Sequence, residues 1–238
     1  MIRRTTAMAE VHALVVAAGR GTRFGSEAPK QYSSIAGRTV LEHAVQPFLD
    51  HPEILDVTVV LADDDERFGA LSLAHSERLH TASGGAQRAR SVLNGLRTLQ
   101  GRGASEDALV LVHDGARPCV TRAEIDALLA LGEGMLALPV SDTLKSWSEI
   151  AGQVLIDTTL AREGVLRALT PQCFRLERLC DALSGALAAG RVPSDEAQAI
   201  EWTGARVAVA WGAATNIKVT TPGDLLLAAA VLAARDIG

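Results

Sequence analysis

The first residues that could carry chemistry follow the first apolar run of the chain. They read Ala17-Ala18-Gly19-Arg20-Gly21-Thr22-Arg23-Phe24-Gly25 and continue into Pro29-Lys30-Gln31. Backbone N–H groups of a glycine-rich loop can approach a phosphate closely, and two cations in the same loop can neutralise a polyphosphate. The loop is not a dinucleotide fingerprint, because Phe24 occupies a position that needs a small residue. It is not a Walker loop either, because Gly-Lys-Ser/Thr is absent. We therefore predict a polyphosphate site of another kind.

A second candidate is the string His113-Asp114-Gly115-Ala116-Arg117-Pro118, which follows the clearest apolar run. A carboxylate directly after a buried strand could meet Mg²⁺ or substrate hydroxyls, and Arg117 could reach a phosphate. Asp114 could instead cap its own turn and pair with Arg117, since aspartate often hydrogen-bonds to nearby backbone. His113 is expected to pack at the end of the strand rather than to act as a catalyst.

Strands and helices alternate along the chain and must position these residues. The expected strands are 11–17, 57–61, 78–82, 108–113, 135–140, 206–211 and 216–220. The expected helices are 40–49, one opened by the acidic segment 63–66, 86–99, one capped by Thr121 with Glu124 and ending at 131, and one from Pro222 onward. Apolar strands that alternate with amphipathic helices indicate the α/β class, here a Rossmann-like three-layer sandwich with a mainly parallel sheet. Ligands of such sheets bind beyond the carboxyl ends of the strands, where both candidate strings lie.

The segment 141–159 interrupts this alternation. It is polar, contains Gly152 and has short alternating stretches, which indicates a protruding β-hairpin arm over about 141–160. No linker, repeat or low-complexity tract divides the sequence. We therefore predict a flexible tail over 1–10 and a single domain over 11–238 that carries the arm.

Composition limits the classes of protein that the chain can represent. It has 238 residues, 48% of them hydrophobic, and a net charge of −5. The length suits one large α/β domain, and the acidic balance argues against a nucleic-acid or anionic-membrane partner. Cys119, Cys173 and Cys180 show no metal-ligand spacing, and no apolar run is long and clean enough to span a bilayer. We expect free thiols in a reducing compartment and a cytoplasmic protein.

The string A-A-G-x-G-x-R followed by P-K-Q resembles the nucleotidyltransferase superfamily, which attaches nucleoside monophosphates to phosphorylated small molecules. Six further strings narrow the resemblance to the 2-C-methyl-D-erythritol 4-phosphate cytidylyltransferase family. They are 84–92 (G-G-x-x-R-x-x-S-V), 113–118 (H-D-x-A-R-P), 139–145 (P-V-x-D-T-x-K), 170–174 (T-P-Q-x-F), 194–197 (S-D-E-A) and 216–225 (N-I-K-V-T-T-P-x-D-L). The seven strings occur in family order over nearly the whole chain.

The resemblance implies transfer of CMP from CTP to 2-C-methyl-D-erythritol 4-phosphate, with release of pyrophosphate, in the non-mevalonate route to isoprenoids. It also implies a fold of the nucleotide-diphospho-sugar transferase type, Mg²⁺ or another divalent cation as cofactor, and a homodimer formed through the arm. Asp114 is a candidate metal ligand, directly or through water. The implied catalytic residues are Arg23, Lys30 and Lys218. The implied nucleotide-binding residues are Ala17, Ala18, Gly19, Gly21, Gly84, Gly85, Arg88 and Ser91. The implied substrate-binding residues are Asp114, Arg117, Thr143, Arg162, Thr170 and Ser194.

Three positions depart from the family pattern. Ala86 stands where many members have Asp, so a side-chain contact is absent from the turn that helps hold the cytosine and ribose. After Arg162, the pair Val165-Leu166 replaces the commoner Leu-Trp, so local packing is expected to differ. Gly223 replaces Glu at the start of the last helix, which is expected to weaken the electrostatics of that helix end.

The residues leave two other functions open. A cytidylyltransferase for another sugar-alcohol phosphate, such as ribitol 5-phosphate, would share the glycine-rich loop, H-D-x-A-R-P and Lys218. The arm and the T-P-Q and S-D-E-A strings favour methylerythritol phosphate over that alternative. A catalytically silent nucleotide-binding protein is disfavoured, because it has no need of Arg23, Lys30, Asp114 and Lys218 together. We also expect no fused cyclase domain, because the sequence ends directly after the last helix.

Overall fold

The computed structural model describes residues 10–19 and 29–235, so the predicted tail over 1–10 lies outside the described residues except for Glu10. The central sheet contains β1 (Val11–Val16), β4 (Asp56–Leu61), β5 (Leu79–Ser83), β6 (Leu109–Asp114), β7 (Gly134–Pro139), β10 (Leu166–Arg175) and β11 (Val209–Trp211). The α-helices are α1 (Val40–Leu49), α2 (Arg88–Gly101), α3 (Arg122–Leu131), α4 (Leu176–Ala188), α5 (Glu196–Glu201) and α6 (Pro222–Arg235). Smaller elements are β2 (Ser34–Ile35), which pairs with β3 (Arg38–Thr39), and the 3-10 helices η1 (Lys30–Tyr32), η2 (Phe68–Ala70) and η3 (Ser72–His75).

The order of the strands creates a crevice in which a ligand can bind. Across the sheet the order is β11-β7-β10-β6-β1-β4-β5, and neighbouring strands are parallel except where β10 is one of the pair. From β1 the chain moves outward to β4 and β5 and then crosses back to β6, on the other side of β1. This reversal is a topological switch point, the place where open α/β sheets bind ligands. The predicted α/β class with a mainly parallel sheet is confirmed.

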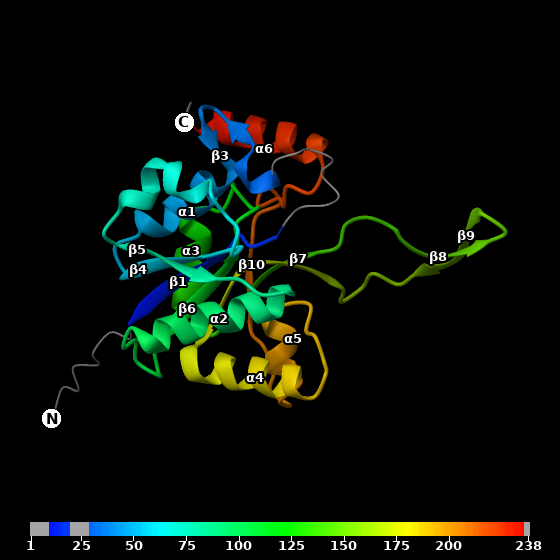
Figure 1. Ribbon diagram of the computed structural model, residues 1–238. Helices are drawn as coiled ribbons and strands as arrows, with labels where there is room; N and C mark the ends of the chain where they lie inside the picture. The colour runs from blue at the N-terminus through cyan, green and yellow to red at the C-terminus, as the bar shows by residue number, and fades with distance from the viewer. Residues whose placement is uncertain (1–9, 20–28, 236–238) are drawn as a thin grey trace, which may run out of the picture.

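Helices cover both faces of the sheet, as Figure 1 shows. One face packs on α2, α4 and α5 through a buried cluster that includes Leu14 and Leu96, and the other packs on α1 and α3 through a cluster that includes Val15 and Phe48. Successive residues of β1 thus enter different cores, which is why its run is apolar without alternation. No helix in the described part of the chain is long and apolar enough to cross a membrane.

Two helices begin with capping boxes. The Thr121 side chain accepts the N–H of Glu124, and the Glu124 side chain accepts the N–H of Thr121, as their spacing predicts. Thr39 and Glu42 make the same exchange at the start of α1. Each box satisfies backbone donors that a helix leaves without a partner.

The helix predicted from the acidic segment 63–66 is wrong. Asp65 accepts hydrogen bonds from the backbone N–H groups of Arg67 and Phe68, at 3.0 and 3.1 Å. This local turn competes with helix formation, as aspartate side chains often do, and only η2 and η3 follow it.

The strand predicted at 216–220 is also wrong. Val219 donates its N–H to the carbonyl of Ala116 in a loop, and Thr220 donates its N–H to the side chain of Asp224 in α6, instead of to a neighbouring strand. The strand expected at 206–211 is reduced to β11. Among the elements that were not predicted, β10 and α4 are the longest. β10 changes register between Ala168 and Gln172, around Pro171, which cannot donate to a ladder. The sequence of β10 contains polar residues and a proline, so its strand pattern is weak.

The arm is a β-hairpin of β8 (Leu144–Ile150) and β9 (Gln153–Leu160), as predicted, and it projects far from the sheet (Figure 1). Ala151 and Gly152 at its tip have φ values of 54° and 79°, which suit a two-residue hairpin turn. The arm exposes large apolar side chains, including Trp147 (59% exposed) and Ile156 (62% exposed). A two-stranded ribbon alone is only marginally stable in water, and the described part of the chain leaves these side chains uncovered.

Candidate active site

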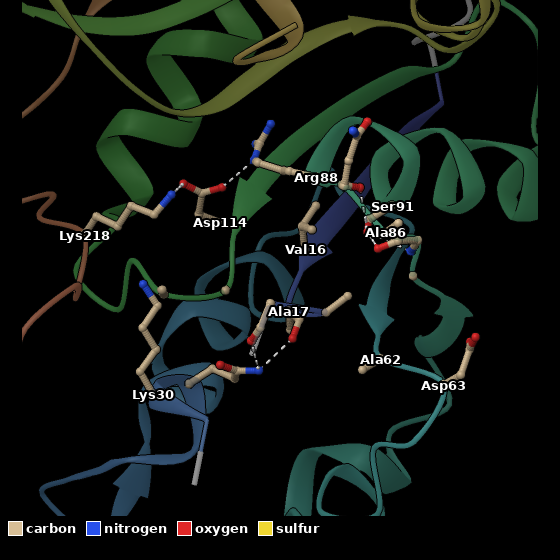
Figure 2. A pocket seen from close by; sticks show the side chains of 18 of the residues that line it. Val16, Ala17, Lys30, Ala62, Asp63, Ala86, Arg88, Ser91, Asp114 and Lys218 are labelled. Atoms are coloured by element: carbon tan, nitrogen blue, oxygen red, sulfur yellow. Dashed lines mark hydrogen bonds and ion pairs between the residues drawn. The ribbon is translucent and has the colours of Figure 1, made fainter. Parts of the chain in front are cut away.

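A pocket of about 830 Å³ opens beyond the carboxyl ends of β1, β4, β5 and β6, around the switch point (Figure 2). This volume lies in the range of small-molecule sites. Four groups of residues line it: the end of β1 with η1, the segment after β4, the turn between β5 and α2, and a charged cluster around Asp114. Figure 2 shows Asp63, after β4, on the opposite side of the pocket from Lys30 and Lys218. The two lysines therefore face the same end of the pocket.

The chain leaving β1 is held in place by Gln31. The side-chain amide of Gln31 donates to the carbonyls of Ala17 at 2.7 Å and Gly19 at 3.1 Å. Lys30, on the same short helix, lines the pocket. Gln31 was not predicted as a site residue, although the P-K-Q string was the signal that could have found it. Gly21 and Arg23, which were predicted, lie outside the described residues.

The turn between β5 and α2 presents backbone to the pocket. A Cβ on Gly84 would lie 2.4 Å from the Cβ of Ala18, so only glycine fits this close approach. Ser91 accepts a hydrogen bond from the N–H of Gly85 at 3.0 Å. Asn94, which the sequence did not single out, donates to the carbonyl of Gly84 at 3.0 Å. The structure brings together the described nucleotide-binding candidates Ala17, Ala18, Gly19, Gly84, Gly85, Arg88 and Ser91.

Asp114, the last residue of β6, is surrounded by positive charge (Figure 2). Its Oδ2 lies 2.8 Å from Nζ of Lys218 and 3.5 Å from Nε of Arg117. Its Oδ1 accepts from Nε of Arg88 at 2.9 Å. Burial alone would raise the pKa of Asp114, but these three cations together hold that pKa well below its usual range. Asp114 is therefore an anion, and it pairs with Arg88 and Lys218, which come from distant parts of the sequence, at one edge of the pocket.

Glu196, in the first turn of α5, is a second anchor for Arg88. The guanidinium donates to both carboxylate oxygens, at 2.6 and 3.2 Å. Burial raises the pKa of Glu196, against the opposing charge of Arg88. Burial also works against the charge of Arg88, but Glu196 and Asp114 outweigh it and raise the pKa of Arg88. Asp195 caps α5 by accepting the N–H of Gln198. The pairing of Glu196 with Arg88 was not foreseen.

His113 is a packed residue, as expected. It is fully buried beside Phe48, and burial lowers its pKa to about 4, so the ring is neutral at pH 7. Nε2 of His113 lies 3.1 Å from the carbonyl of Arg117, which can only accept, so Nε2 carries the proton of the neutral ring. Nδ1 therefore accepts from the Thr170 hydroxyl at 3.0 Å, and the same hydroxyl accepts the N–H of Asp114. The neutral ring thereby fixes the turn that carries Asp114.

Several predicted substrate-binding residues lie away from the pocket. Arg117 and Thr170 are buried behind it, and Ser194 is exposed just before α5. Thr143 and Arg162 lie at the base of the arm, on either side of the hairpin. None of these five described residues lines the pocket of its own chain, and their contacts with substrate stay predictions.

The departures from the family pattern occupy three different environments. Ala86 lines the pocket, and Leu166 begins β10 with 40% of its surface exposed. At the start of α6 the acid is supplied by Asp224 instead of residue 223. Its carboxylate accepts the N–H and hydroxyl groups of Thr220 and Thr221, which lower the pKa of Asp224 to about 2. The expected weakening by Gly223 stays a prediction.

Comparisons with known proteins cover almost the whole chain. Residues 11–234 match the sequence model of the family described as "IspD: 2-C-methyl-D-erythritol 4-phosphate cytidylyltransferase". The chain is 45% identical over 226 residues to the 2-C-methyl-D-erythritol 4-phosphate cytidylyltransferase of Vibrio vulnificus (strain CMCP6), which covers 93% of this chain and 94% of that protein. It is 47% identical over 218 residues to the enzyme of that name from Pseudomonas aeruginosa, and the match covers 90% of this chain and 92% of that protein.

Solved structures have the same fold. A crystal structure of 4-diphosphocytidyl-2C-methyl-D-erythritol synthase is similar with a TM-score of 0.81 at 33% identity, covering 94% of this chain and 99% of the other. The 2-C-methyl-D-erythritol 4-phosphate cytidylyltransferase of Thermus thermophilus is similar with a TM-score of 0.75 at 34% identity, covering 93% of this chain and 98% of the other.

Proposed function

The chain belongs to the 2-C-methyl-D-erythritol 4-phosphate cytidylyltransferase family, and from this membership we propose how its pocket transfers CMP from CTP to 2-C-methyl-D-erythritol 4-phosphate. A phosphate oxygen of the acceptor attacks the α-phosphorus of CTP in line and forms a new P–O bond. The bond from the α-phosphorus to the bridging oxygen breaks, and pyrophosphate leaves with the electron pair. The product is 4-diphosphocytidyl-2-C-methyl-D-erythritol, an intermediate on the way to isoprenoids. The attacking oxygen is already ionised near pH 7, so no strong general base is required.

The observation that carries this mechanism is the gathering of Lys30, Arg88 and Lys218 around one pocket whose described lining includes no histidine or cysteine. Such a pocket lacks a nucleophile-and-base pair but can stabilise charge on phosphates. We assign Lys30 and Lys218 to the α-phosphate and the leaving pyrophosphate. Arg23 joins them through the family resemblance. Catalysis then rests on positioning and on charge stabilisation, as in other phosphoryl transfers.

The cytosine and ribose are assigned to the turn between β5 and α2. Close packing of Gly84 on Ala18 brings backbone donors and acceptors to the pocket surface, and Ser91 orders the N–H of Gly85. Backbone groups and a hydroxyl can read the edge of a base by hydrogen bonding. Ala86 adds no side-chain contact, so recognition of the base in this chain rests on the backbone of the turn.

Mg²⁺ is the proposed cofactor, held mainly by the phosphates of CTP. Among residues 10–19 and 29–235, no group of three acidic, histidine or cysteine side chains is placed to hold a metal ion. Both oxygens of Asp114 already contact cations, so this carboxylate fits a water-mediated contact better than direct coordination. Mg²⁺ commonly keeps several waters and binds substrate phosphates, and the site suits an ion that arrives with the nucleotide. When bound, it would neutralise charge on the phosphate oxygens.

The arm is proposed to join two copies of the chain. Its apolar side chains, such as Trp147 and Ile156, are exposed in the single chain. Thr143 and Arg162 do not line the pocket of their own chain, so contact with substrate phosphate would require the arm of a second copy. Sedimentation at micromolar concentration should show a dimer. The variant Trp147→Asp should shift the protein toward the monomer, and a monomeric parent protein would contradict the proposal.

Acceptor-dependent release of pyrophosphate tests the function directly. With CTP and Mg²⁺, release should require 2-C-methyl-D-erythritol 4-phosphate and should be slow with ribitol 5-phosphate. Faster turnover of ribitol 5-phosphate would assign the chain to a sister activity. Binding of CTP and Mg²⁺ by calorimetry without turnover of any acceptor would support a silent nucleotide-binding protein.

A further inference from the structure

Lys218 stands in a segment without regular secondary structure. Residues 212–221 form neither helix nor strand, yet the Nζ of Lys218 lies 2.8 Å from Asp114 at the edge of the pocket. A long side chain on an unsupported loop would sample many positions, at a cost in catalytic precision. The segment therefore needs anchors on both sides of Lys218. On one side, Val219 donates its N–H to the carbonyl of Ala116 at 2.8 Å.

Asn216 provides the anchor on the other side. It is 0% exposed, and its side-chain amide donates to Oε1 of Glu124 at 3.1 Å and to the carbonyl of Thr170 at 2.9 Å. Both partners are acceptors, so the NH₂ group must face them, and Oδ1 is left buried without a partner. The Asn216 carbonyl accepts from Nη1 of Arg117 at 2.9 Å. One residue thus joins the loop to α3, β10 and the turn after β6.

Glu124 has two tasks at once. Its Oε2 accepts the N–H and the hydroxyl of Thr121 and so caps α3. Its Oε1 accepts the N–H of Ala213 at 2.9 Å in addition to the Asn216 amide. A Cβ on Gly212 would lie 3.3 Å from Oε1 of Glu124 and 2.6 Å from the Leu169 side chain, so a side chain at this position would crowd the contact. Glu124 is 5% exposed and its carboxylate accepts four hydrogen bonds, which fixes it as a rigid attachment point for the loop.

We propose that Asn216 is a positioning residue for Lys218 and that Glu124 is the anchor through which Asn216 acts. The inference rests on the proposed role of Lys218 in cytidylyl transfer. Asn216 touches neither nucleotide nor acceptor in this arrangement, because it is buried behind the pocket and does not line it. Its effect on the reaction must therefore pass through the placement of the Lys218 backbone, two residues away.

A double-mutant cycle on kcat tests this role, with pyrophosphate release measured for the parent, N216A, K218A and N216A/K218A. N216A should lower kcat by about 10- to 100-fold, since misplacing a reacting group by about 1 Å can cost ~10²-fold. In the K218A background the same substitution should change kcat by less than about 2-fold, because the group that it positions is gone. Equal losses in both backgrounds, or a near-normal kcat for N216A alone, would overturn the positioning role. A near-normal kcat for K218A alone would instead refute the role of Lys218 in the proposed function.

A matched control separates positioning from loss of stability. Arg78 donates to the backbone carbonyls of Leu49 and Leu55, outside the pocket lining. R78A should lower the Tm and leave kcat unchanged. If R78A lowers kcat as much as N216A at a similar loss of Tm, general destabilisation explains both and the proposal fails.

A second pair of variants covers the case in which N216A does not fold. E124Q keeps one acceptor oxygen for the N–H groups of Asn216 and Ala213 while its amide faces Thr121. It should therefore keep kcat near that of the parent and lose some stability at the cap of α3. E124L has a similar volume but no acceptor, and its kcat should fall toward that expected for N216A. Equal kcat values for E124Q and E124L would refute the anchor role of Glu124.

Discussion

Two walls of the pocket are built in different ways. The backbone wall consists of Ala17, Ala18, Gly84 and Gly85, where the chain itself approaches the ligand site and side chains are small. The charged wall consists of Arg88, Asp114 and Lys218, which are joined by ion pairs between segments up to 104 residues apart. A wall of backbone is disrupted when a side chain is added, whereas a wall of charges is disrupted when one is removed. Adding a side chain should therefore test the backbone wall, and removing a charged side chain should test the charged wall.

The largest effect on kcat is expected at Lys30 and Lys218, which mark the phosphate end of the pocket. Lys218→Ala or Lys30→Ala should lower kcat by about 10²- to 10³-fold, because each removes charge aimed at phosphates during transfer. Steady-state kinetics with saturating CTP and acceptor would measure it. A near-normal kcat in both variants would mean that the lysines stabilise the pocket without serving the reaction.

The turn next to Asp114 is held by His113 in its neutral form. This predicts that the free energy of unfolding depends on pH. The pKa of His113 is about 4 in the folded protein, against about 6.5 for an unperturbed histidine. Between these values the unfolded chain binds more protons, so stability should rise with pH and be fully present above about pH 6.5. The loss on acidification to pH 4 should reach about 3 kcal/mol. Urea unfolding at pH 4.5 to 7 would measure it, with His113→Gln as the variant in which this part of the slope disappears. An unchanged slope in that variant would assign the pH dependence to other groups.

The backbone wall should respond to an added methyl group. Gly84→Ala places a Cβ 2.4 Å from Ala18, and the shift needed to relieve it should raise KM for CTP by about 10-fold. Gly185→Ala is a matched control, because α4 has open space at that position and alanine favours helix by about 1 kcal/mol. The control should keep its KM and gain stability. Equal KM values for the two variants would show that the turn tolerates a side chain.

The smallest effect is expected from one hydroxyl that supports the backbone wall. Ser91→Ala leaves the N–H of Gly85 without its partner, at a cost of about 1 kcal/mol. We expect KM for CTP to rise by about 5-fold with little change in kcat. Ser72→Ala removes an exposed hydroxyl far from the pocket and should change neither value. A fall in kcat for Ser91→Ala would place this hydroxyl at the phosphate end of the pocket.

Sequence reasoning named the residues of both walls, but it predicted the local structure of the backbone wall better than the contacts of the charged wall. The glycine-rich strings and the buried runs before them are local signals, and they identified β1, β6 and the turn at Gly84. The same reasoning placed Lys218 on a strand that does not exist. It offered the pairing of Asp114 with Arg117 as an alternative, but it did not find the hydrogen bond from Arg117 to the carbonyl of Asn216, 99 residues away. Contacts between segments this distant leave no periodic pattern in the sequence.

The sequence by itself determined the α/β alternation, the capping box at Thr121, the hairpin arm and the two loops that end at the pocket. These features depend on side-chain periodicity, turn residues and short-range hydrogen bonds, all of which are determined by residues close together in the sequence. Only the tertiary structure decided that Glu196 anchors Arg88, that Asn94 holds the Gly84 carbonyl and that Glu124 and Asn216 fasten the loop of Lys218. Each of these polar groups is buried or half-buried, and its partner is chosen by which segments the folded sheet brings together.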